Sequence, residues 1–355
     1  MPLHPLITES ILEDLEEIAL HSESDLKHLV EQDIVITGAS GFIGTWLTLS
    51  WIAAHKKWSG SGKLWLTSRN PSTVIEMANS IKKNTPVASV SSDIRALTIP
   101  DGFANGLIIH AATPASASLN TSDPMTMFNT ITEGYDRVLY EARRTKSKVL
   151  SLSSGAVYGN QPLTMSHISE EWEGNDSDSA SYSAYHEGKR VAETMGEVDA
   201  SKWGTPIVTA RLFAFIAPFL PFGTHFAAGN FMRDALSGSQ IKINSGGGSI
   251  RSYQYSTDLC SSLWALLARG VPGEKYNVGS DAAVSIRELA QAVARNVKPS
   301  SKVIVHGKDT SENVTRYVPS IAKIGKLGVR NLVGLDAALQ RTAQWSIQAA
   351  KESNQ

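Results

Sequence analysis

The sequence predicts an α/β protein, with a doubly wound parallel sheet followed by a smaller mixed C-terminal lobe. Three observations predict this class. Short apolar runs alternate with helical periodicity up to about Arg211, a glycine-rich turn joins the first run to a long helix, and the alternation becomes irregular beyond that point. Alternating strands and helices build parallel sheets that are covered on both faces. The chain has 355 residues, which is enough for two lobes.

The elements follow one another in a regular order. Residues 1–32 are predicted to be an N-terminal helical extension, in which Ser10 and Glu13 have the spacing of a capping box. Residues 33–213 form the predicted sheet domain, and residues 214–355 the smaller lobe, of which about 251–272 is expected to return to the core. The predicted elements of the sheet domain are the strand Asp33–Thr37, a helix in GFIGTWLTLSWIAA, the strand Lys63–Thr67, the helix Pro71–Lys83, the strands Val87–Val90 and Leu107–His110, the helix Asp123–Arg144 and the strand Lys148–Ser154.

Composition excludes several classes of protein. Lys and Arg total 33 against 34 Asp and Glu, so the balance gives no basic surface for nucleic acid. Cys260 is the only cysteine, which rules out an internal disulfide or a thiolate metal cluster. We predict no metal site, because the nine histidines have no ligand spacing. The start of the chain is acidic and no apolar run is long enough to span a bilayer, so we expect a cytoplasmic protein without a membrane partner.

A glycine-rich loop, TGASGFIG, stands between the first predicted strand and the first long helix. Glycine is needed where the backbone turns sharply and where a pyrophosphate approaches the N–H groups of a helix N-terminus. The loop therefore predicts a Rossmann-type dinucleotide site, and a glycine turn without a ligand is the alternative. The loop residues expected to contact the cofactor are Gly38, Ser40, Gly41, Phe42, Ile43 and Gly44.

The second predicted strand ends in Ser68 and Arg69, where an acidic residue would hold the adenosine 2′-hydroxyl of NAD. A hydroxyl and a guanidinium favour a 2′-phosphate instead. We therefore expect NADP as the preferred cofactor and NAD as the alternative. If Arg69 is only a solvated loop cation, this preference disappears.

Tyr185 and Lys189 are four residues apart in a predicted helix, so they share one face. A neighbouring ammonium and an oxidised nicotinamide would both favour the phenolate, which predicts a lowered pKa for Tyr185 and a role in proton transfer. Ser153 and Ser154 end the strand KVLSLSS, where a doubly wound sheet opens to ligands. The three glycines at 246–248 lie between two apolar runs and are expected to form a tight turn between strands rather than a second phosphate site.

Seven pieces of the sequence, in this order, resemble those of the extended short-chain dehydrogenase/reductases, the NAD(P)-dependent nucleotide-sugar epimerase, dehydratase and reductase family. They are TGASGFIG, SSDIR, HAATPAS, SSGAVYG, the Tyr185–Lys189 spacing, RLFAFIAP and RSYQYSTD. The resemblance implies that Ser154 is the catalytic hydroxyl, that Tyr185 is the acid/base and that Lys189 also holds the nicotinamide ribose. It implies further cofactor contacts from Asp93, Ile94, Ala111 and Ala112, and substrate contacts from Thr113, Asn230 and Arg251, with Arg251 gripping the nucleotide diphosphate.

Two departures from the family pattern narrow the expected activity. The 4,6-dehydratases of the family carry an Asp-Glu pair where this chain has Gly155 and Ala156, so dehydration is disfavoured. Ala214 and Ala217 replace residues that are usually Asn and Gly. The resemblance thus implies NADPH-dependent reduction of a 4-keto-6-deoxy nucleotide sugar by a homodimer. An NAD-dependent nucleotide-sugar 4-epimerase is the alternative, and a non-catalytic NAD(P)-sensing protein is a third hypothesis.

Overall fold

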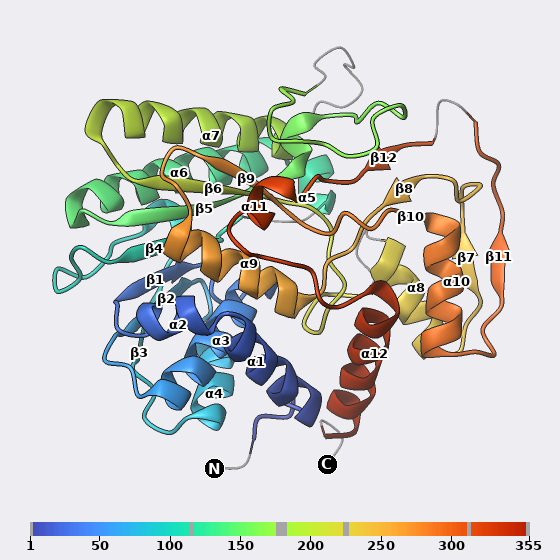
Figure 1. Cartoon of the computed structure of the whole chain (residues 1–355), viewed down its shortest axis with the longest axis horizontal. Helices are drawn as coiled ribbons and strands as arrows, with labels where there is room; N and C mark the ends of the chain where they lie inside the picture. Colours follow the sequence, from blue (N-terminus) through green and yellow to red (C-terminus); the bar gives the residue numbers. More distant parts are fainter. Residues whose placement is uncertain (1–2, 114–116, 175–182, 223–226, 311–313, 353–355) are drawn as a thin grey trace. The chain divides into compact units, whose positions relative to one another are not determined.

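The structure, a computed structural model, describes residues 3–113, 117–174, 183–222, 227–310 and 314–352. The predicted class is confirmed, with a central sheet flanked by helices and two small sheets built from later strands (Figure 1). The strands of the central sheet are β1 (Ile34–Thr37), β2 (Leu64–Ser68), β3 (Val87–Ser91), β4 (Leu107–His110), β5 (Lys148–Ser154), β6 (Ile207–Leu212) and β9 (Lys275–Val278).

The strand order of the central sheet is β3-β2-β1-β4-β5-β6-β9. From β3 to β5 neighbouring strands are parallel, with Ile34 of β1 opposite Leu64 of β2 and Leu107 of β4. The order reverses between β1 and β4, and ligands of such sheets bind outside the carboxyl ends of the strands at that reversal. β1 and β4 end at Thr37 and His110, so the glycine loop begins at the reversal.

Helices cover both faces of the sheet: α6 packs on α7, and α3 packs on α4 (Figure 1). Local signals set both ends of α6. At its start, the Asp123 side chain accepts a hydrogen bond from the Thr126 N–H, and Pro124 occupies the first turn. At its end, Lys146 adopts a left-handed conformation. The helices of this part are α3 (Phe42–Trp58), α4 (Ser72–Ile81), α5 (Ala117–Ser122), α6 (Pro124–Thr145), α7 (Ala184–Trp203) and α9 (Ser256–Arg269), with the 3₁₀ helices η1 (Ile94–Ala96) and η2 (Gly155–Tyr158).

The segment before β1 forms two helices, α1 (Glu9–His21) and α2 (Glu23–Leu29), which both pack against α3. The predicted capping box is wrong. Thr8 is the N-cap residue of α1, and Ser10 is buried inside the helix with its hydroxyl 2.9 Å from that of Thr8. The helix therefore begins two residues earlier than the Ser10–Glu13 spacing indicates.

α3 is buried along most of its length, including Trp46 and Trp51. A helix that is apolar on all sides must be covered on all sides. The Trp51 indole N–H donates to the Leu29 carbonyl of α2 at 3.4 Å, and the Ser50 hydroxyl accepts from the Trp264 indole of α9 at 3.0 Å. Within the described ranges, no helix combines the length and the apolar character that crossing a membrane requires.

The chain divides into two compact units. Unit 1 comprises Met1–Val157, Tyr182–Arg211 and Cys260–Tyr276, and unit 2 comprises Tyr158–Ser181, Leu212–Leu259 and Asn277–Gln355. Unit 2 has one sheet of order β10-β8-β12 and another of order β11-β7. Its elements are α8 (Ala227–Leu236), β7 (Ile241–Ile243), β8 (Ile250–Arg251), β10 (Val284–Ser285), α10 (Ile286–Val297), β11 (Val303–Val305), β12 (Arg316–Tyr317), α11 (Ala322–Gly325) and α12 (Leu335–Glu352).

The glycine run at 246–248 lies between two strands, as predicted, but these strands do not pair with each other. β7 and β8, on either side of the run, belong to different sheets. Gly247 has a φ of +89°, and a Cβ at Gly246 would lie 2.3 Å from Asp309. Each strand pairs with a partner much later in the chain, which the local pattern of two apolar runs cannot indicate.

Candidate active site

The glycine loop has the geometry that a bound pyrophosphate requires. Gly38 has a φ of +68°, and a Cβ there would lie 2.7 Å from the Ala111 carbonyl oxygen. A Cβ at Gly44 would lie 2.4 Å from the Gly38 carbonyl oxygen, so both glycines permit close backbone packing. Gly41 differs, because a Cβ there would meet only one atom, at 3.2 Å. Gly41 is the exposed N-cap residue of α3, and its open side lets a ligand approach the first N–H groups of the helix.

The other loop residues predicted to contact the cofactor surround this opening. Ser40 is exposed, while Phe42 and Ile43 are half-buried in the first turn of α3. Thr45 N–H donates to the Gly41 carbonyl at 2.8 Å, so the helix is regular from its first turn. The first-turn N–H groups of α3 point out of the N-terminal end of the helix beside the open side of Gly41, where an anion can approach.

Thr37 and His110, which the sequence reasoning missed, fix the backbone at the reversal of strand order. The Thr37 hydroxyl oxygen accepts from the N–H groups of Ala111 and Ala112, both at 3.2 Å, and lies 3.0 Å from His110 Nδ1. Burial lowers the pKa of His110 to about 3, with a smaller contribution from Lys189, so the imidazole is neutral. The strands β1 and β4, which are neighbours in the sheet, are apolar runs that each end in a polar residue. This pattern is the sequence signal for Thr37 and His110.

The residues predicted at the adenosine lie at the ends of β2 and β3. Ser68 is buried, and within the part of the chain that the structure describes its hydroxyl has no hydrogen-bond partner. An orphaned buried hydroxyl at this point fits a ribose or its phosphate. Arg69 is exposed, and Asp93 pairs with Arg95 at 2.9 Å. The Arg95 hydrogen bonds, with a smaller contribution from the Arg69 charge, hold the pKa of Asp93 below its usual value.

Ser154, Tyr185 and Lys189 come together at the end of β5 in unit 1. Tyr185 is the second residue of α7, whose N-cap Ser183 accepts from the His186 N–H. Its phenol lies close enough to Ser154 for the serine hydroxyl to lower the tyrosine pKa. The Ser154 hydroxyl oxygen also accepts from the Ala156 N–H at 3.1 Å. One turn along α7, the buried Lys189 ammonium donates to the Leu152 carbonyl at 2.6 Å and to the Thr113 hydroxyl at 2.9 Å.

Burial changes the pKa values of Tyr185 and Lys189 in ways that the sequence reasoning did not consider. Burial raises the pKa of Tyr185, and the Ser154 hydrogen bond lowers it only in part. Burial also lowers the pKa of Lys189 to about 8, against the opposing influence of Glu193. Spacing along a helix gives no measure of how far two groups are removed from water, so the sequence reasoning did not include the rise that burial gives the pKa of Tyr185. The phenol is thus a neutral proton donor.

Glu193 continues the series of Tyr185 and Lys189 by one further turn of α7, and the sequence reasoning overlooked it. Its carboxylate accepts from Arg211 Nη2 at 2.6 Å and from the Ser153 hydroxyl at 2.6 Å, and lies 3.5 Å from the Lys275 ammonium. Both Glu193 and Arg211 are buried. Burial alone would raise the pKa of Glu193, but the bonds from Arg211 and Ser153 keep it below its ordinary value. The buried Glu193 carboxylate therefore contacts Ser153, the neighbour of Ser154, and raises the pKa of Lys189.

Asn230 and Arg251 line one cavity of about 690 Å³ in unit 2. The Arg251 guanidinium donates to the Thr315 carbonyl at 3.1 Å and to the Thr315 hydroxyl at 2.8 Å, which fixes its direction. Asn230 accepts from Arg233 at 3.2 Å. Three cations and one anion are among the lining residues, so the cavity suits an anionic ligand. The charged residues of the lining are Arg233, Asp234, Lys242 and Arg251.

Unit 1 therefore gathers the cofactor loop, Thr113 and the Ser154 group, and unit 2 gathers Asn230 and Arg251. Two predicted motifs are only partly described. Residues 114–116 of HAATPAS and residues 181–182 before Tyr185 lie outside the described residues.

Comparison with known proteins gives a family for this arrangement. The model of the NAD dependent epimerase/dehydratase family matches residues 34–279. UDP-glucuronic acid decarboxylase 1 of Xenopus tropicalis is 26% identical over 345 residues, which is 94% of this chain and 77% of that protein.

Solved structures share the fold. A UDP-N-acetylglucosamine 4-epimerase from Methanobrevibacter ruminantium M1, in complex with UDP-N-acetylmuramic acid, has a TM-score of 0.77 at 17% identity over 89% of this chain and 98% of that one. A UDP-glucuronic acid 4-epimerase from Bacillus cereus, in complex with UDP-glucuronic acid and NAD, has a TM-score of 0.72 at 19% identity over 89% and 99%.

Proposed function

Because the chain belongs to the NAD-dependent epimerase/dehydratase family, we propose that it transfers hydride between a nicotinamide cofactor and a carbon of a nucleotide-activated sugar. The observation that carries this proposal is the placement of the Tyr185 phenol beside Ser154 at the carboxyl end of β5, with the bonded Lys189 ammonium one turn further along α7. Two hydroxyl groups placed in this way can both contact one carbonyl or alcohol oxygen.

In the reductive direction, Tyr185 donates its phenolic proton to the sugar carbonyl oxygen while Ser154 hydrogen-bonds the same oxygen. When bound, the nicotinamide supplies the hydride. The raised pKa of Tyr185 keeps the phenol protonated until the carbonyl oxygen takes the proton. The ammonium of Lys189, held by Thr113 and the Leu152 carbonyl, then favours the phenolate that remains.

The specific reaction that we propose is reduction of a 4-keto-6-deoxy sugar. Elimination of water needs a further acid and base beside the reacting carbons. Gly155 and Ala156, which follow Ser154, offer neither, and the nearby Glu193 carboxylate is occupied by Arg211 and Ser153. A single proton transfer coupled to hydride transfer needs only Ser154, Tyr185 and Lys189.

A 4-epimerase is the second candidate, and the comparisons favour it. The similar proteins are named as a decarboxylase and epimerases of UDP-sugars, reactions with no net oxidation. The same three residues would serve it, because an epimerase withdraws a proton and hydride from one sugar carbon and returns them. The two candidates differ in whether reduced cofactor is consumed.

We assign the cofactor to unit 1 and the nucleotide part of the substrate to the cavity of unit 2. The fit of unit 1 rests on the open side of Gly41 and the unpartnered Ser68 hydroxyl. The fit of unit 2 rests on the cations Arg233, Lys242 and Arg251 in the lining of its cavity, because a diphosphate is an anion.

NADP is the proposed cofactor, because Ser68 and Arg69 offer a hydroxyl and a cation and no carboxylate where the 2′-substituent is expected. We expect Arg69→Ala to raise the Kd for NADPH about tenfold and to leave the Kd for NADH unchanged. Fluorescence titration of both cofactors measures this. Lys83→Ala, at an exposed cation after α4, is the control that should change neither value. Equal affinity of the wild-type protein for both cofactors, or tighter NADH binding, would favour NAD.

The proposed function is tested by incubating the protein with NADPH or NADH and UDP- or dTDP-linked 4-keto-6-deoxy sugars. We expect one equivalent of reduced cofactor to be consumed per product alcohol. Turnover of UDP-glucose or UDP-glucuronic acid into an epimer without net cofactor consumption would replace the reductase by the epimerase. Absence of both activities in a protein that binds the cofactor would count against the proposal as a whole.

A further inference from the structure

The segment after β3 lies at the adenosine end of the proposed cofactor site. Ser91 of β3 is opposite Ser68 of β2, and the Ser92 N–H donates to the Ser68 carbonyl at 3.1 Å. Asp93, the next residue, caps η1 by accepting from the Arg95 N–H at 3.0 Å. Asp93 and Ile94 therefore stand beside the end of β2, where the adenosine of a dinucleotide binds in this kind of sheet.

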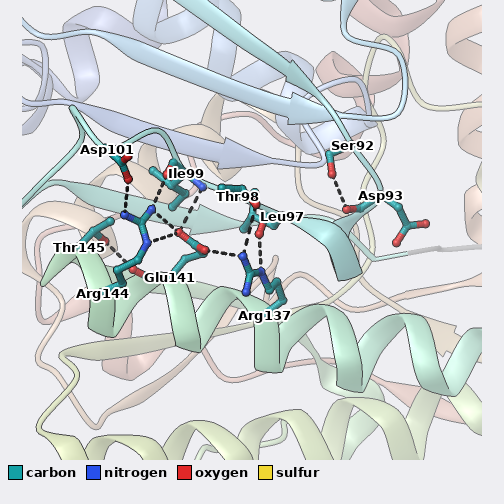
Figure 2. Close-up of polar contacts among 10 residues, drawn as sticks. All are labelled: Ser92, Asp93, Leu97, Thr98, Ile99, Asp101, Arg137, Glu141, Arg144 and Thr145. Atoms are coloured by element: carbon teal, nitrogen blue, oxygen red, sulfur yellow. Dashed lines mark hydrogen bonds and ion pairs between the residues drawn. The ribbon is translucent and has the colours of Figure 1, made fainter.

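Directly after η1, three consecutive residues are bonded to α6 (Figure 2). Arg137 donates to the Leu97 carbonyl and, at 3.3 Å, to the Thr98 hydroxyl. Arg144 donates to the Ile99 carbonyl. The Ile99 N–H donates to the Glu141 carboxylate at 3.2 Å. Both N–H and carbonyl groups of the segment 97–99 are thus hydrogen-bonded to side chains of α6.

Glu141 is the centre of this group of contacts. Its carboxylate accepts from Arg137 at 2.8 Å and from Arg144 at 2.6 Å, and its side chain is 1% exposed. Figure 2 shows the two guanidinium groups on either side of it. Asp101, which is exposed, takes a further bond from Arg144 at 3.2 Å. We call Arg137, Glu141 and Arg144 the α6 clamp.

The other end of the segment packs on the same helix. Ile94 is 9% exposed, and a Cβ at Gly134 of α6 would lie 2.8 Å from Ile94 Cγ2. The absence of a side chain at Gly134 thus lets η1 lie close to α6. η1 and the residues after it are fixed at both ends to one rigid helix.

An ion group around one buried carboxylate is a poor source of stability, because removing the Glu141 charge from water offsets much of its attraction to the two guanidinium groups. Its directional bonds can still specify one backbone position. Here the specified backbone is the one that carries Asp93 and Ile94.

We propose that the α6 clamp, with Gly134, positions Asp93 and Ile94 for the adenosine half of the cofactor. Arg137, Glu141 and Arg144 are then positioning residues, since each acts through the segment 93–99. This inference rests on the proposed function, because it assumes a dinucleotide at the ends of β1 to β3. The nicotinamide half binds elsewhere, near Lys189, so the clamp should distinguish the two halves.

The test uses ADP-ribose and nicotinamide mononucleotide as separate probes of the two halves, with Kd measured by NMR titration of the full-length protein. Glu141→Gln keeps the shape of the side chain and removes its charge. We expect it to raise the Kd for ADP-ribose about tenfold and to change the Kd for nicotinamide mononucleotide by less than about twofold. Asp136→Asn, at an exposed position of the same helix, is the matched control and should change neither.

Arg137→Met is the second variant, should Glu141→Gln fail to fold. It removes the bonds to Leu97 and Thr98 and leaves the pair of Glu141 with Arg144 intact. A selective loss of ADP-ribose affinity in either variant supports the clamp. Unchanged ADP-ribose binding, or equal losses for both probes, would overturn it. A wild-type protein that binds neither probe would instead refute the proposed function.

Discussion

Tyr185→Phe is expected to lower kcat by a factor of roughly 10²–10⁴, because it removes the phenolic proton donor beside Ser154. The ring still fills its place against the core cluster of unit 1, so folding should be unaffected. Cofactor binding should also be unchanged. Steady-state kinetics with saturating cofactor, together with a cofactor titration, measures the two quantities.

Tyr140→Phe is the matched control, since Tyr140 is exposed on α6. It removes a phenolic hydroxyl from the same unit and should leave kcat unaltered. A Tyr185→Phe protein that retains activity within a few fold of the wild type would remove Tyr185 from the mechanism, and the non-catalytic hypothesis would then need to be reconsidered.

Glu193→Gln is expected to lower the free energy of unfolding by about 3 kcal/mol, because it leaves the buried Arg211 guanidinium without its anion. Chemical denaturation at neutral pH measures this. The pKa of Glu193 is held below its usual 4.5, so its contribution to stability is present above that value and is lost as the pH falls below it. The difference between wild type and variant should therefore shrink in acid.

The same variant should change the pH dependence of activity. Glu193 raises the pKa of Lys189, which burial has lowered to about 8. Since the ammonium is the form that favours the phenolate, kcat/KM should fall as the pH rises through that value, and in Glu193→Gln the fall should begin at lower pH. Glu197→Gln, one turn further on the exposed side of α7, is the control. A profile identical to wild type would show that Glu193 acts only on stability.

The sheet could be predicted from the sequence because its strands are short apolar runs ended by polar residues. The predicted limits of β4 and β5 agree with the structure. Those of β1, β2 and β3 differ from it by at most one residue at each end. The same holds for α6, where Asp123 and Pro124 mark the start. In these places the local chemistry and the final fold agree.

What could not be predicted depends on contacts between distant segments. Glu193 meets Arg211 of β6 and Lys275 of β9, and nothing local to α7 indicates either partner. The raised pKa of Tyr185 reflects its burial. The pairing of β7 with β11 depends on a strand that comes 62 residues later in the chain, from Ile241 to Val303. Patterns along the chain carry no information on such distances in space.

The cover that α1 and α2 place over α3 has a consequence for how the protein can be shortened. A chain cut just before Asp33 would keep every residue of the nucleotide loop, yet the outer side of α3, with Trp51, would face water. Such a fragment would expose a broad apolar surface on the helix that begins at the loop, and it would be prone to self-association. The first two helices therefore keep the helix that follows the loop covered, although neither contributes a residue to the loop.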